Sequence, residues 1–466
     1  MTGQVFRYES FRTDAERGLL TCTYSLDGRE FAERVTLPPG PGWNTPAAQA
    51  AARLVFLLAG VSYYKTAAPP VIDLGRTALT QREREFLRDF NLNGLAEFAY
   101  RNQLSLESLQ FRPASDGNVS IAQLTRSSGI DCAIDTLAGA GADAAGSGAG
   151  AADTEAGGGR ALVPFGGGID SIVTVEAMRE RADVALFVVS RPGDTYDAIE
   201  RPAAAAGLPV RRAERAIDPQ LFSSAENGFL NGHVPVTGII SAIAVLAAVL
   251  DGRDAVVMSN EWSASIPTLE FEGKPVNHQY SKSASFEAAF RGVLAETAHD
   301  MPQYFSWLRD RTELWVGREF ANLKKYHSTF RSCNKAFYSD RNRRLDHWCG
   351  QCDKCCFIDL ILAPFLPKAA LQEIFAVSGE PLGHPELKPK FRALLGAGAK
   401  PFECVGEVTE CRAAVLLAAQ RQDRAGDGLL AELATEVSGW PDAPTQADIE
   451  RMGRPVGENF VPARYR

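Results

Sequence analysis

Residues 161–171 read Ala-Leu-Val-Pro-Phe-Gly-Gly-Gly-Ile-Asp-Ser, and few folds accommodate such a segment. A short apolar strand, residues 161–165, runs into three glycines, and a helix follows. Glycines allow backbone N–H groups to approach an anion closely, and the start of a helix adds partial positive charge. The segment therefore predicts a phosphate-binding turn made by Gly166, Gly167 and Gly168, in which Ser171 donates to a phosphate oxygen and Asp170 holds Mg²⁺ through water. The alternative is a turn that serves only the strand-to-helix geometry.

Strand and helix patterns alternate after this turn. We expect strands over residues 184–190 and 255–259, and helices over 170–180 and 238–250. Such alternation predicts an α/β fold with a parallel sheet and helices on both faces. Ligands of these folds bind outside the carboxyl ends of the strands. Ser190 and Glu261, at or just after predicted strand ends, are therefore candidate ligand-binding residues, and Lys282 in a Tyr-Ser-Lys-Ser segment is a candidate second phosphate clamp. Each of these residues taken singly is more often structural.

Five of the nine cysteines fall within residues 333–356. Four thiolates with the spacing C-x₁₅-C-x₂-C-x₂-C can enclose one tetrahedral zinc ion, and a closed four-thiolate site is structural. Cys356 is then a spare buried thiol, or it replaces the last ligand. An iron–sulfur cluster is the alternative, because thiolate spacing alone does not separate the two. The predicted ligands are Cys333, Cys349, Cys352 and Cys355.

The 466-residue chain has 49 Lys and Arg against 57 Asp and Glu, a net charge of −8. This charge argues against a general nucleic-acid-binding protein. Basic residues are nevertheless concentrated near the cysteines, and they predict a clamp for an anionic substrate such as a diphosphate. A solvated basic loop is the alternative. The arginines proposed for the clamp are Arg331, Arg341, Arg343 and Arg344.

Residues 137–159 are almost entirely Ala and Gly, and we expect a mobile linker there. The linker divides the chain into a small N-terminal α+β module (1–136), the ligand-binding domain with its metal site (160–365) and a mostly helical C-terminal region (366–466). The apolar stretch 238–250 is shorter than the ~20 residues that span a membrane, and the first residues do not form a signal peptide. We therefore expect a cytoplasmic protein that does not enter the membrane.

The glycine turn resembles the Ser-Gly-Gly-x-Asp-Ser loop of the PP-loop ATP pyrophosphatases, whose fold is adenine nucleotide alpha-hydrolase-like. Gly166 stands in the place of the leading Ser, and Ile169 supplies no extra cation. Residues 232–237 and the cysteine cluster are similar to segments of the 7-cyano-7-deazaguanine synthases, although the gap between the first two cysteines is longer here. The resemblance implies cleavage of ATP between its α and β phosphates, with Mg²⁺ bound.

The chain as a whole resembles the UDP-N-acetyl-α-D-muramoyl-L-alanyl-L-glutamate epimerases. The similar segments are residues 58–65 (Leu-Ala-Gly-Val-Ser-Tyr-Tyr-Lys), 94–98 (Gly-Leu-Ala-Glu-Phe), the glycine turn, the cysteine cluster and 400–407 (Lys-Pro-Phe-Glu-Cys-Val-Gly-Glu). For the first two segments, ordinary packing is the favoured interpretation from the residues alone. The resemblance implies an isomerase that uses ATP and Mg²⁺, contains structural Zn²⁺, and inverts the terminal L-Glu of a UDP-linked muramoyl dipeptide during peptidoglycan synthesis.

Inversion needs acid–base groups at the α-carbon. Adenylation of the neighbouring carboxylate removes its charge, so that a base can take the α-proton and return of a proton to the other face inverts the centre. Cys404 is the leading base, with Asp170 and Glu261 as further catalytic candidates. Rivals to Cys404 are Glu403, Glu407, Glu410, Cys411 and His384, and a buried inert thiol is the structural alternative. Two other functions stay open: a PP-loop ligase similar to the deazaguanine synthases, and a non-catalytic nucleotide-binding protein.

Overall fold

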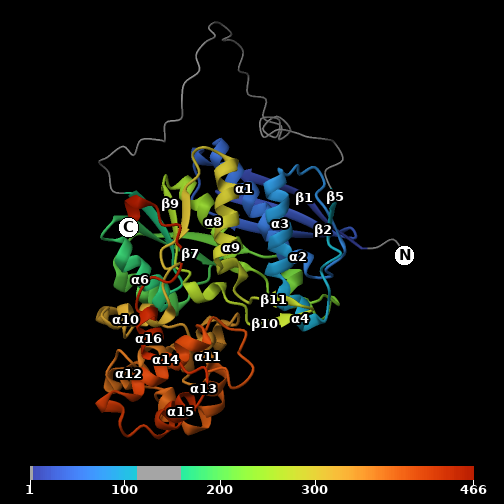
Figure 1. Ribbon diagram of the computed structural model, residues 1–466. Coiled ribbons are helices and arrows are strands. Elements are labelled where there is room, and N and C mark those ends of the chain that lie inside the picture. Colours follow the sequence, from blue (N-terminus) through green and yellow to red (C-terminus); the bar gives the residue numbers. More distant parts are fainter. Residues whose placement is uncertain (1–3, 113–158) are drawn as a thin grey trace, which may run out of the picture.

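Ten strands form one continuous sheet in a computed structural model that describes residues 4–112 and 159–466 (Figure 1). Most of the predicted linker and Cys132 lie outside the described residues, and Gly159 begins a strand. The strand order is β12-β9-β6-β7-β8-β3-β2-β1-β4-β5. The strands are β1 Val5–Asp14, β2 Leu19–Leu26, β3 Arg29–Thr36, β4 Val71–Asp73, β5 Gln110–Arg112, β6 Gly159–Pro164, β7 Ala182–Ser190, β8 Val210–Ala216, β9 Ala255–Met258 and β12 Gln303–Ser306, and β10 Leu269–Phe271 pairs separately with β11 Lys274–Val276.

The five strands β12, β9, β6, β7 and β8 are parallel to one another. Helices α6 (Ile169–Met178) and α7 (Asp197–Ala206) pack on one face, and α8 (Val236–Leu250) and α9 (Ala284–Thr297) pack on the other. Alternate strand residues enter the two cores, as Val163 and Leu162 of β6 do. This confirms the predicted α/β class with a mostly parallel sheet. The strand order reverses between β6 and β9, and such a switch point opens a ligand crevice at the carboxyl ends.

The N-terminal strands extend this sheet. β1, β2 and β3 form an antiparallel meander, and β3 pairs antiparallel with β8. At that junction Glu33 is fully buried, accepts from Arg215 (Nε–Oε1 2.8 Å), and accepts from the hydroxyl of Tyr63 (3.0 Å). Helix α1 (Pro46–Ala59) packs against α8. The predicted N-terminal module and the parallel strands therefore share one sheet and one core, and independent folding of the module stays a prediction.

Several helices are fixed by side chains at their first residues. Thr80 and Glu83 form a reciprocal cap at the start of α3, and Ser283 and Thr312 cap α9 and α10. Helix α8 is apolar on all sides because it is buried between the sheet and α1. The remaining helices of the first half are α2 Val61–Tyr64, α3 Gln81–Gly94 and α4 Ala96–Asn102.

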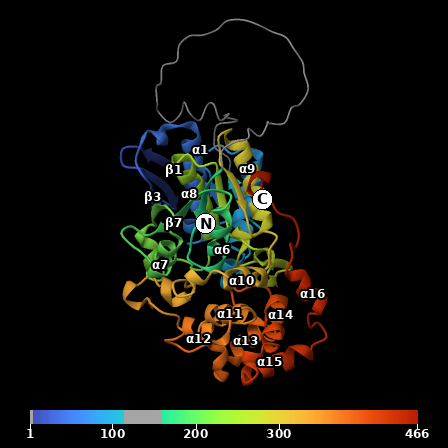
Figure 2. The same ribbon diagram turned by 90° about the vertical axis from the view of Figure 1, so that its left-hand side faces the viewer.

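The C-terminal helices pack beneath the carboxyl edge of the parallel strands (Figures 1 and 2). The last residues return to the sheet, where the ring of Tyr465 packs 5.2 Å from that of Phe305. These helices are α10 Glu313–Ala321, α11 Asp353–Leu362, α12 Lys368–Ile374, α13 Lys388–Leu394, α14 Val408–Ala419, α15 Gly428–Ser438 and α16 Gln446–Met452.

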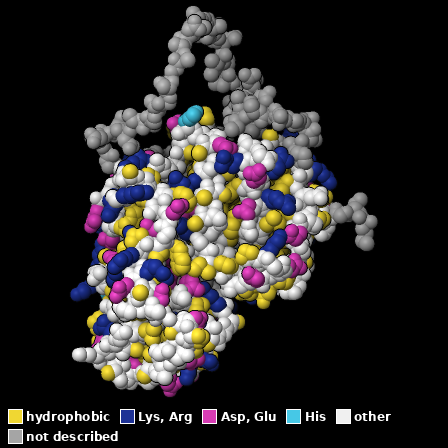
Figure 3. Space-filling model, in the orientation of Figure 1, with side chains coloured by type: hydrophobic (Ala, Val, Ile, Leu, Met, Phe, Trp, Pro, Cys, Tyr) yellow, Lys and Arg dark blue, Asp and Glu magenta, His cyan; other side chains and the backbone are white. Residues whose placement is uncertain are grey.

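One stretch, Pro46–Tyr64, is long and apolar enough by length and composition to cross a membrane, but 78% of that window is buried inside the protein. Acidic and basic side chains are interspersed over the face in Figure 3, without a large field of one sign.

Candidate functional site

The glycine turn joins β6 to α6 at the switch point of the sheet. Gly167 has φ +75°, and a Cβ there would lie 2.2 Å from the carbonyl oxygen of Ala198, so only glycine fits. A Cβ at Gly166 would meet no atom within 4 Å, which leaves that part of the turn open to a ligand. The hydroxyl of Ser171 donates to the carbonyl oxygen of Gly168 (3.0 Å). Gly167 is therefore required by the backbone conformation of the turn, whereas Gly166 leaves room for an anion.

Carboxylates from three elements meet beside this turn. Asp170 begins α6, Glu261 follows β9 and Glu313 begins α10. Burial and the nearby Glu261 raise the pKa of Asp170 to about 6, although Lys354 and Lys282 oppose the shift. Burial and Asp170 also raise the pKa of Glu313 well above its usual value. Asp170 Oδ1 and Glu313 Oε2 are buried without a hydrogen-bond partner, and such an acidic cluster suits a divalent cation.

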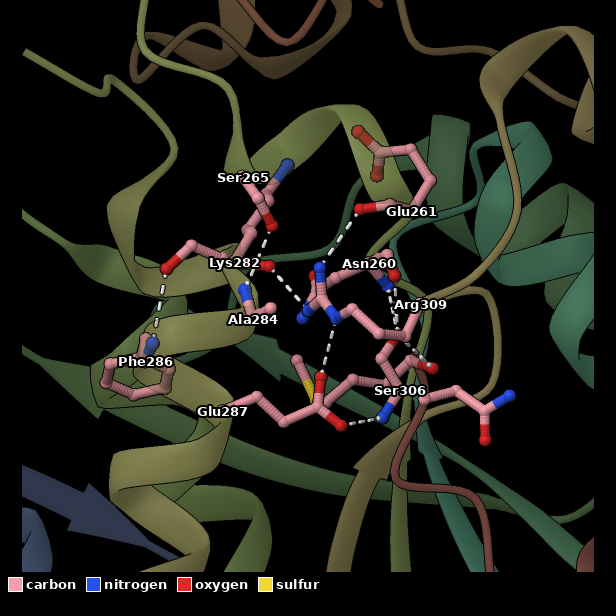
Figure 4. A network of polar contacts seen from close by, with 12 residues as sticks. Asn260, Glu261, Ser265, Lys282, Ala284, Phe286, Glu287, Ser306 and Arg309 are labelled. Carbon is pink, nitrogen blue, oxygen red and sulfur yellow. Dashed lines mark hydrogen bonds and ion pairs between the residues drawn. The ribbon is translucent and has the colours of Figure 1, made fainter. Parts of the chain in front are cut away.

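A buried arginine fixes the positions of Glu261 and Lys282 (Figure 4). Arg309 donates to the carbonyl oxygens of Glu261 (3.0 Å) and Lys282 (2.6 Å) and pairs with Glu287 (Nε–Oε2 2.8 Å). Glu287 in turn accepts from the backbone of Ser306 (2.8 Å) at the end of β12. Figure 4 shows the side chains of Glu261 and Lys282 extending away from Arg309 toward the same side. The network holds both side chains at the edge of the sheet.

Cys404 lies next to Lys282, in the segment between α13 and α14. Lys282 Nζ donates to Cys404 Sγ (3.1 Å), and Lys354 Nζ donates to the Cys404 carbonyl oxygen. Burial alone would raise the pKa of this thiol, but Lys282, a hydrogen bond with His278, and Lys354 lower it to about 6. The thiolate is therefore the main form at neutral pH, as a base or nucleophile requires. The neighbouring Cys404 and Glu261 raise the pKa of Lys282, although burial opposes this shift.

Two histidines and a glutamate lie near Cys404. His233 and Glu97 belong to the segments 232–237 and 94–98, and His278 belongs to none of the segments singled out in the sequence. His278 Nδ1 pairs with Glu97 Oε2, and the ring centroids of His278 and His233 lie 4.3 Å apart. Glu97 belongs to segment 94–98, for which the sequence alone favoured packing. The similarity of that segment to the epimerases was the feature of the sequence that could have identified Glu97. His278 stands in a turn without any recognisable motif.

The four selected cysteines lie together, with their sulfur atoms within 4.8 Å of one another. Measured Sγ–Sγ separations are 4.0 Å (Cys333–Cys352), 3.7 Å (Cys349–Cys355) and 3.4 Å (Cys352–Cys355). A tetrahedral ion with metal–sulfur bonds of about 2.3 Å sets its ligands roughly 3.8 Å apart, so one ion fits. Cys356 lies outside the group.

The cysteine cluster also supports the Cys404 segment. Lys354, in the first turn of α11 after Cys352, holds the Cys404 carbonyl, and Asn334, next to Cys333, donates to Glu403 Oε1 (2.8 Å). Residues adjacent to the cysteine cluster are therefore joined to the Cys404 segment by two hydrogen bonds.

The predicted substrate arginines surround the loop after β7. Arg331 pairs with Asp197 (3.1 Å), whereas Arg341 and Arg344 pair with Asp194 (2.9 and 2.7 Å). Arg343 is exposed and lies over the ring of Tyr338. Three of the four side chains thus have acidic partners within the chain, and a role in substrate binding stays a prediction.

The other candidates lie apart from Cys404 or have inert surroundings. Ser190 ends β7 at the carboxyl edge, as expected. Burial raises the pKa of Cys411 above the usual range of a thiol, and His384 pairs with Glu386 (3.1 Å) in an exposed turn. A cavity of about 560 Å³ lies at the amino ends of β9 and β12, lined in part by Asp254, Gln303 and Arg464. It does not include the residues described above.

Comparison with known proteins identifies the family. The model of the MurL N-terminal domain matches residues 1–307, and that of the MurL C-terminal domain matches residues 329–448. No solved structure gives a significant match.

Three relatives are named UDP-N-acetyl-alpha-D-muramoyl-L-alanyl-L-glutamate epimerase. That from Salinispora tropica is 37% identical over 99% of this chain and 94% of its own length. That from Xanthomonas oryzae pv. oryzae is 37% identical over 98% of this chain and 95% of its own length. A third with the same name, from a Micromonospora species, is 36% identical over 99% of this chain and 96% of its own length. The chain therefore belongs to the MurL family of muramoyl-dipeptide epimerases.

Proposed function

We propose that the chain inverts the terminal L-glutamate of UDP-N-acetylmuramoyl-L-alanyl-L-glutamate to D-glutamate after activating a carboxylate with ATP. The names of its relatives support the epimerase reaction and the substrate. The observation that carries the mechanism is the meeting of an open glycine turn with a thiolate. Lys282 connects them, because it contacts Cys404 directly and also interacts with Asp170 at the turn. Such a reaction would take place in the cytoplasm, where UDP-linked precursors are made.

The first step joins the substrate carboxylate to AMP. A carboxylate oxygen attacks the α phosphorus of ATP, the bond to the β phosphate breaks, and pyrophosphate leaves. Backbone N–H groups at Gly166–Gly168 and the N-terminus of α6 would bind the phosphates. The unpartnered oxygen of Asp170, with Glu261 beside it, fits Mg²⁺, which would neutralise phosphate charge when bound.

The second step inverts the α-carbon. The Cys404 thiolate takes the α-proton, so that an S–H bond forms and the electron pair of the C–H bond passes into the enolate of the acyl adenylate. A proton then returns to the opposite face, and water releases AMP and the D-epimer. Glu313 is a candidate donor for that face, because burial and Asp170 raise its pKa.

Incubation with ATP, Mg²⁺ and the L-glutamyl substrate in D₂O tests this function. We expect AMP, pyrophosphate and D-glutamate that carries deuterium at the α-carbon. AMP with unchanged L-glutamate would indicate adenylation for a ligase-type transfer. Absence of both products with the intact protein would favour a nucleotide-binding protein without turnover.

We further propose that the four-cysteine cluster holds one structural Zn²⁺. Elemental analysis of the purified protein should give about one zinc per chain. A Cys349→Ser variant should lose the zinc and unfold at a lower temperature, because binding of a structural zinc contributes to folding. A Cys356→Ser variant removes a neighbouring thiol outside the group and should keep the metal. Iron with broad visible absorption would contradict the zinc assignment.

A further inference from the structure

Three residues far apart in the sequence meet at the reactive thiol. Cys404 follows α13, His278 lies between β11 and the 3₁₀ turn Tyr280–Lys282, and Glu97 belongs to α4. His278 Nδ1 pairs with Glu97 Oε2, and the His278 ring lies 6.2 Å from the ring of Phe402, two residues before Cys404. At this position His278 interacts with the Cys404 thiol and helps to lower its pKa. This is the order of a nucleophile or base, an imidazole and an orienting carboxylate.

We propose that Cys404, His278 and Glu97 form a thiolate–imidazolium–carboxylate triad, in which His278 and Glu97 are positioning residues that hold Cys404 ready to take the substrate proton. The role assigned to Cys404 rests on the proposed epimerase function.

Burial and packing make this arrangement specific. The Glu97 and His278 side chains are 5% and 16% exposed, so their ion pair lies largely out of water. Asn277 fixes the turn that carries His278, since its side chain donates to the Ala264 carbonyl (2.9 Å) and accepts from the Gln279 amide (2.7 Å). The Phe402 ring packs 5.8 Å from that of Tyr100 on α4, which brings the Cys404 segment against the helix of Glu97.

The surrounding charges favour the ion pair. Burial would lower the pKa of His278, but hydrogen bonds with Cys404 and Glu97 raise it to about 9, so the ring is an imidazolium at neutral pH. Burial and the charge of His278 lower the pKa of His233 to about 4, so the second ring stays neutral. The charges of Lys282 and Lys354 also act on Cys404, and the charge of His278 acts on Glu403.

Alkylation of Cys404 tests the triad without ATP or substrate. Iodoacetamide labelling, followed for the Cys404 peptide by mass spectrometry, should be half-maximal near pH 6 in the unaltered protein. We expect His278→Gln and Glu97→Gln to move the profile to higher pH. If the midpoint rises by about one pH unit, labelling at about pH 6 falls by up to roughly tenfold. Arg101→Gln is the matched control, because Arg101 also pairs with Glu97 (2.6 Å) but does not take part in the triad.

The outcomes separate this inference from the proposed function. Superimposable profiles in the unaltered protein and in folded His278→Gln or Glu97→Gln would overturn the triad. Each variant removes one member of the triad, so a single folded variant is sufficient for the comparison of labelling profiles. Circular dichroism checks that the variant is folded. A shifted profile in a protein that does not epimerise the substrate would keep the triad and reject the function. Full epimerisation in His278→Gln would leave the function intact and reject the positioning role.

Discussion

A Cys404→Ala variant should lose epimerase activity while it still forms AMP. Removal of a positioned acid–base group lowers a rate by roughly 10²–10⁴-fold. In the proposed mechanism the glycine turn binds the phosphates and the thiol takes no part in the attack on the α phosphorus, so pyrophosphate release with the L-glutamyl substrate should continue. The measurements are α-deuterium incorporation in D₂O, chirality of the released glutamate, and pyrophosphate, all from one reaction mixture.

The matched control is Cys411→Ala. Cys411 lies in the first turn of α14, is 1% exposed, and has a pKa raised by burial, so it is an inert thiol. We expect this variant to epimerise at nearly the normal rate. If Cys404→Ala still inverts glutamate at the full rate, another group is the base. If it loses pyrophosphate release as well, the thiol segment is needed for nucleotide binding and the separation of the two steps is wrong.

An Asp170→Asn variant should lose ATP turnover and become more stable. The carboxylate next to the glycine turn is the proposed Mg²⁺ ligand, and loss of such charge stabilisation lowers rates by roughly 10²-fold or more. Its pKa is raised from 3.8 to about 6 by burial and by Glu261, with opposition from Lys354 and Lys282. Between these values the folded protein binds more protons than the unfolded chain, so stability falls as pH rises through this range. At neutral pH the penalty is on the order of 3 kcal/mol, which the amide removes.

Pyrophosphate release and thermal unfolding at about pH 7 and pH 4 check this prediction. The gain in stability should be largest at the higher pH and nearly absent at the lower one. Asp359→Asn is the control, because Asp359 is also a buried carboxyl whose pKa is raised by burial and by Glu380, but it lies among the C-terminal helices. We expect normal ATP turnover from Asp359→Asn. Undiminished ATP consumption by Asp170→Asn would reject the assignment of the turn.

The parallel sheet and the glycine turn were predictable because local patterns encode them. An apolar strand, a run of glycines and a helix are consecutive in the sequence, and the spacing of the four cysteines within 333–356 is similarly local. The joining of β3 to β8 was not predictable, because strand pairing between distant segments depends on tertiary packing that a single sequence does not reveal.

The same limit applies to the candidate site. Cys404 could be identified from the sequence because its segment resembles one in the epimerases. Its proposed partner His278 stands in a turn without periodicity or motif, and Glu97 lies more than 300 positions before the thiol. The cluster of basic residues near the cysteines could be recognised in the sequence. The ion pairs that its arginines form with Asp194 and Asp197 could not. Sequence patterns identify the reactive groups here, and only the fold supplies the charges that tune them.

The packing of α1 against α8 also has a consequence during synthesis on the ribosome. Helix α1 ends at Ala59, but α8, which covers it, is complete only at Leu250. At translation rates of about 5–20 residues per second, the apolar side of α1 waits roughly 10 to 40 seconds for its partner. The nascent chain therefore carries an uncovered hydrophobic surface through nearly half of its elongation, and a chaperone that binds such surfaces would have its longest opportunity in that interval.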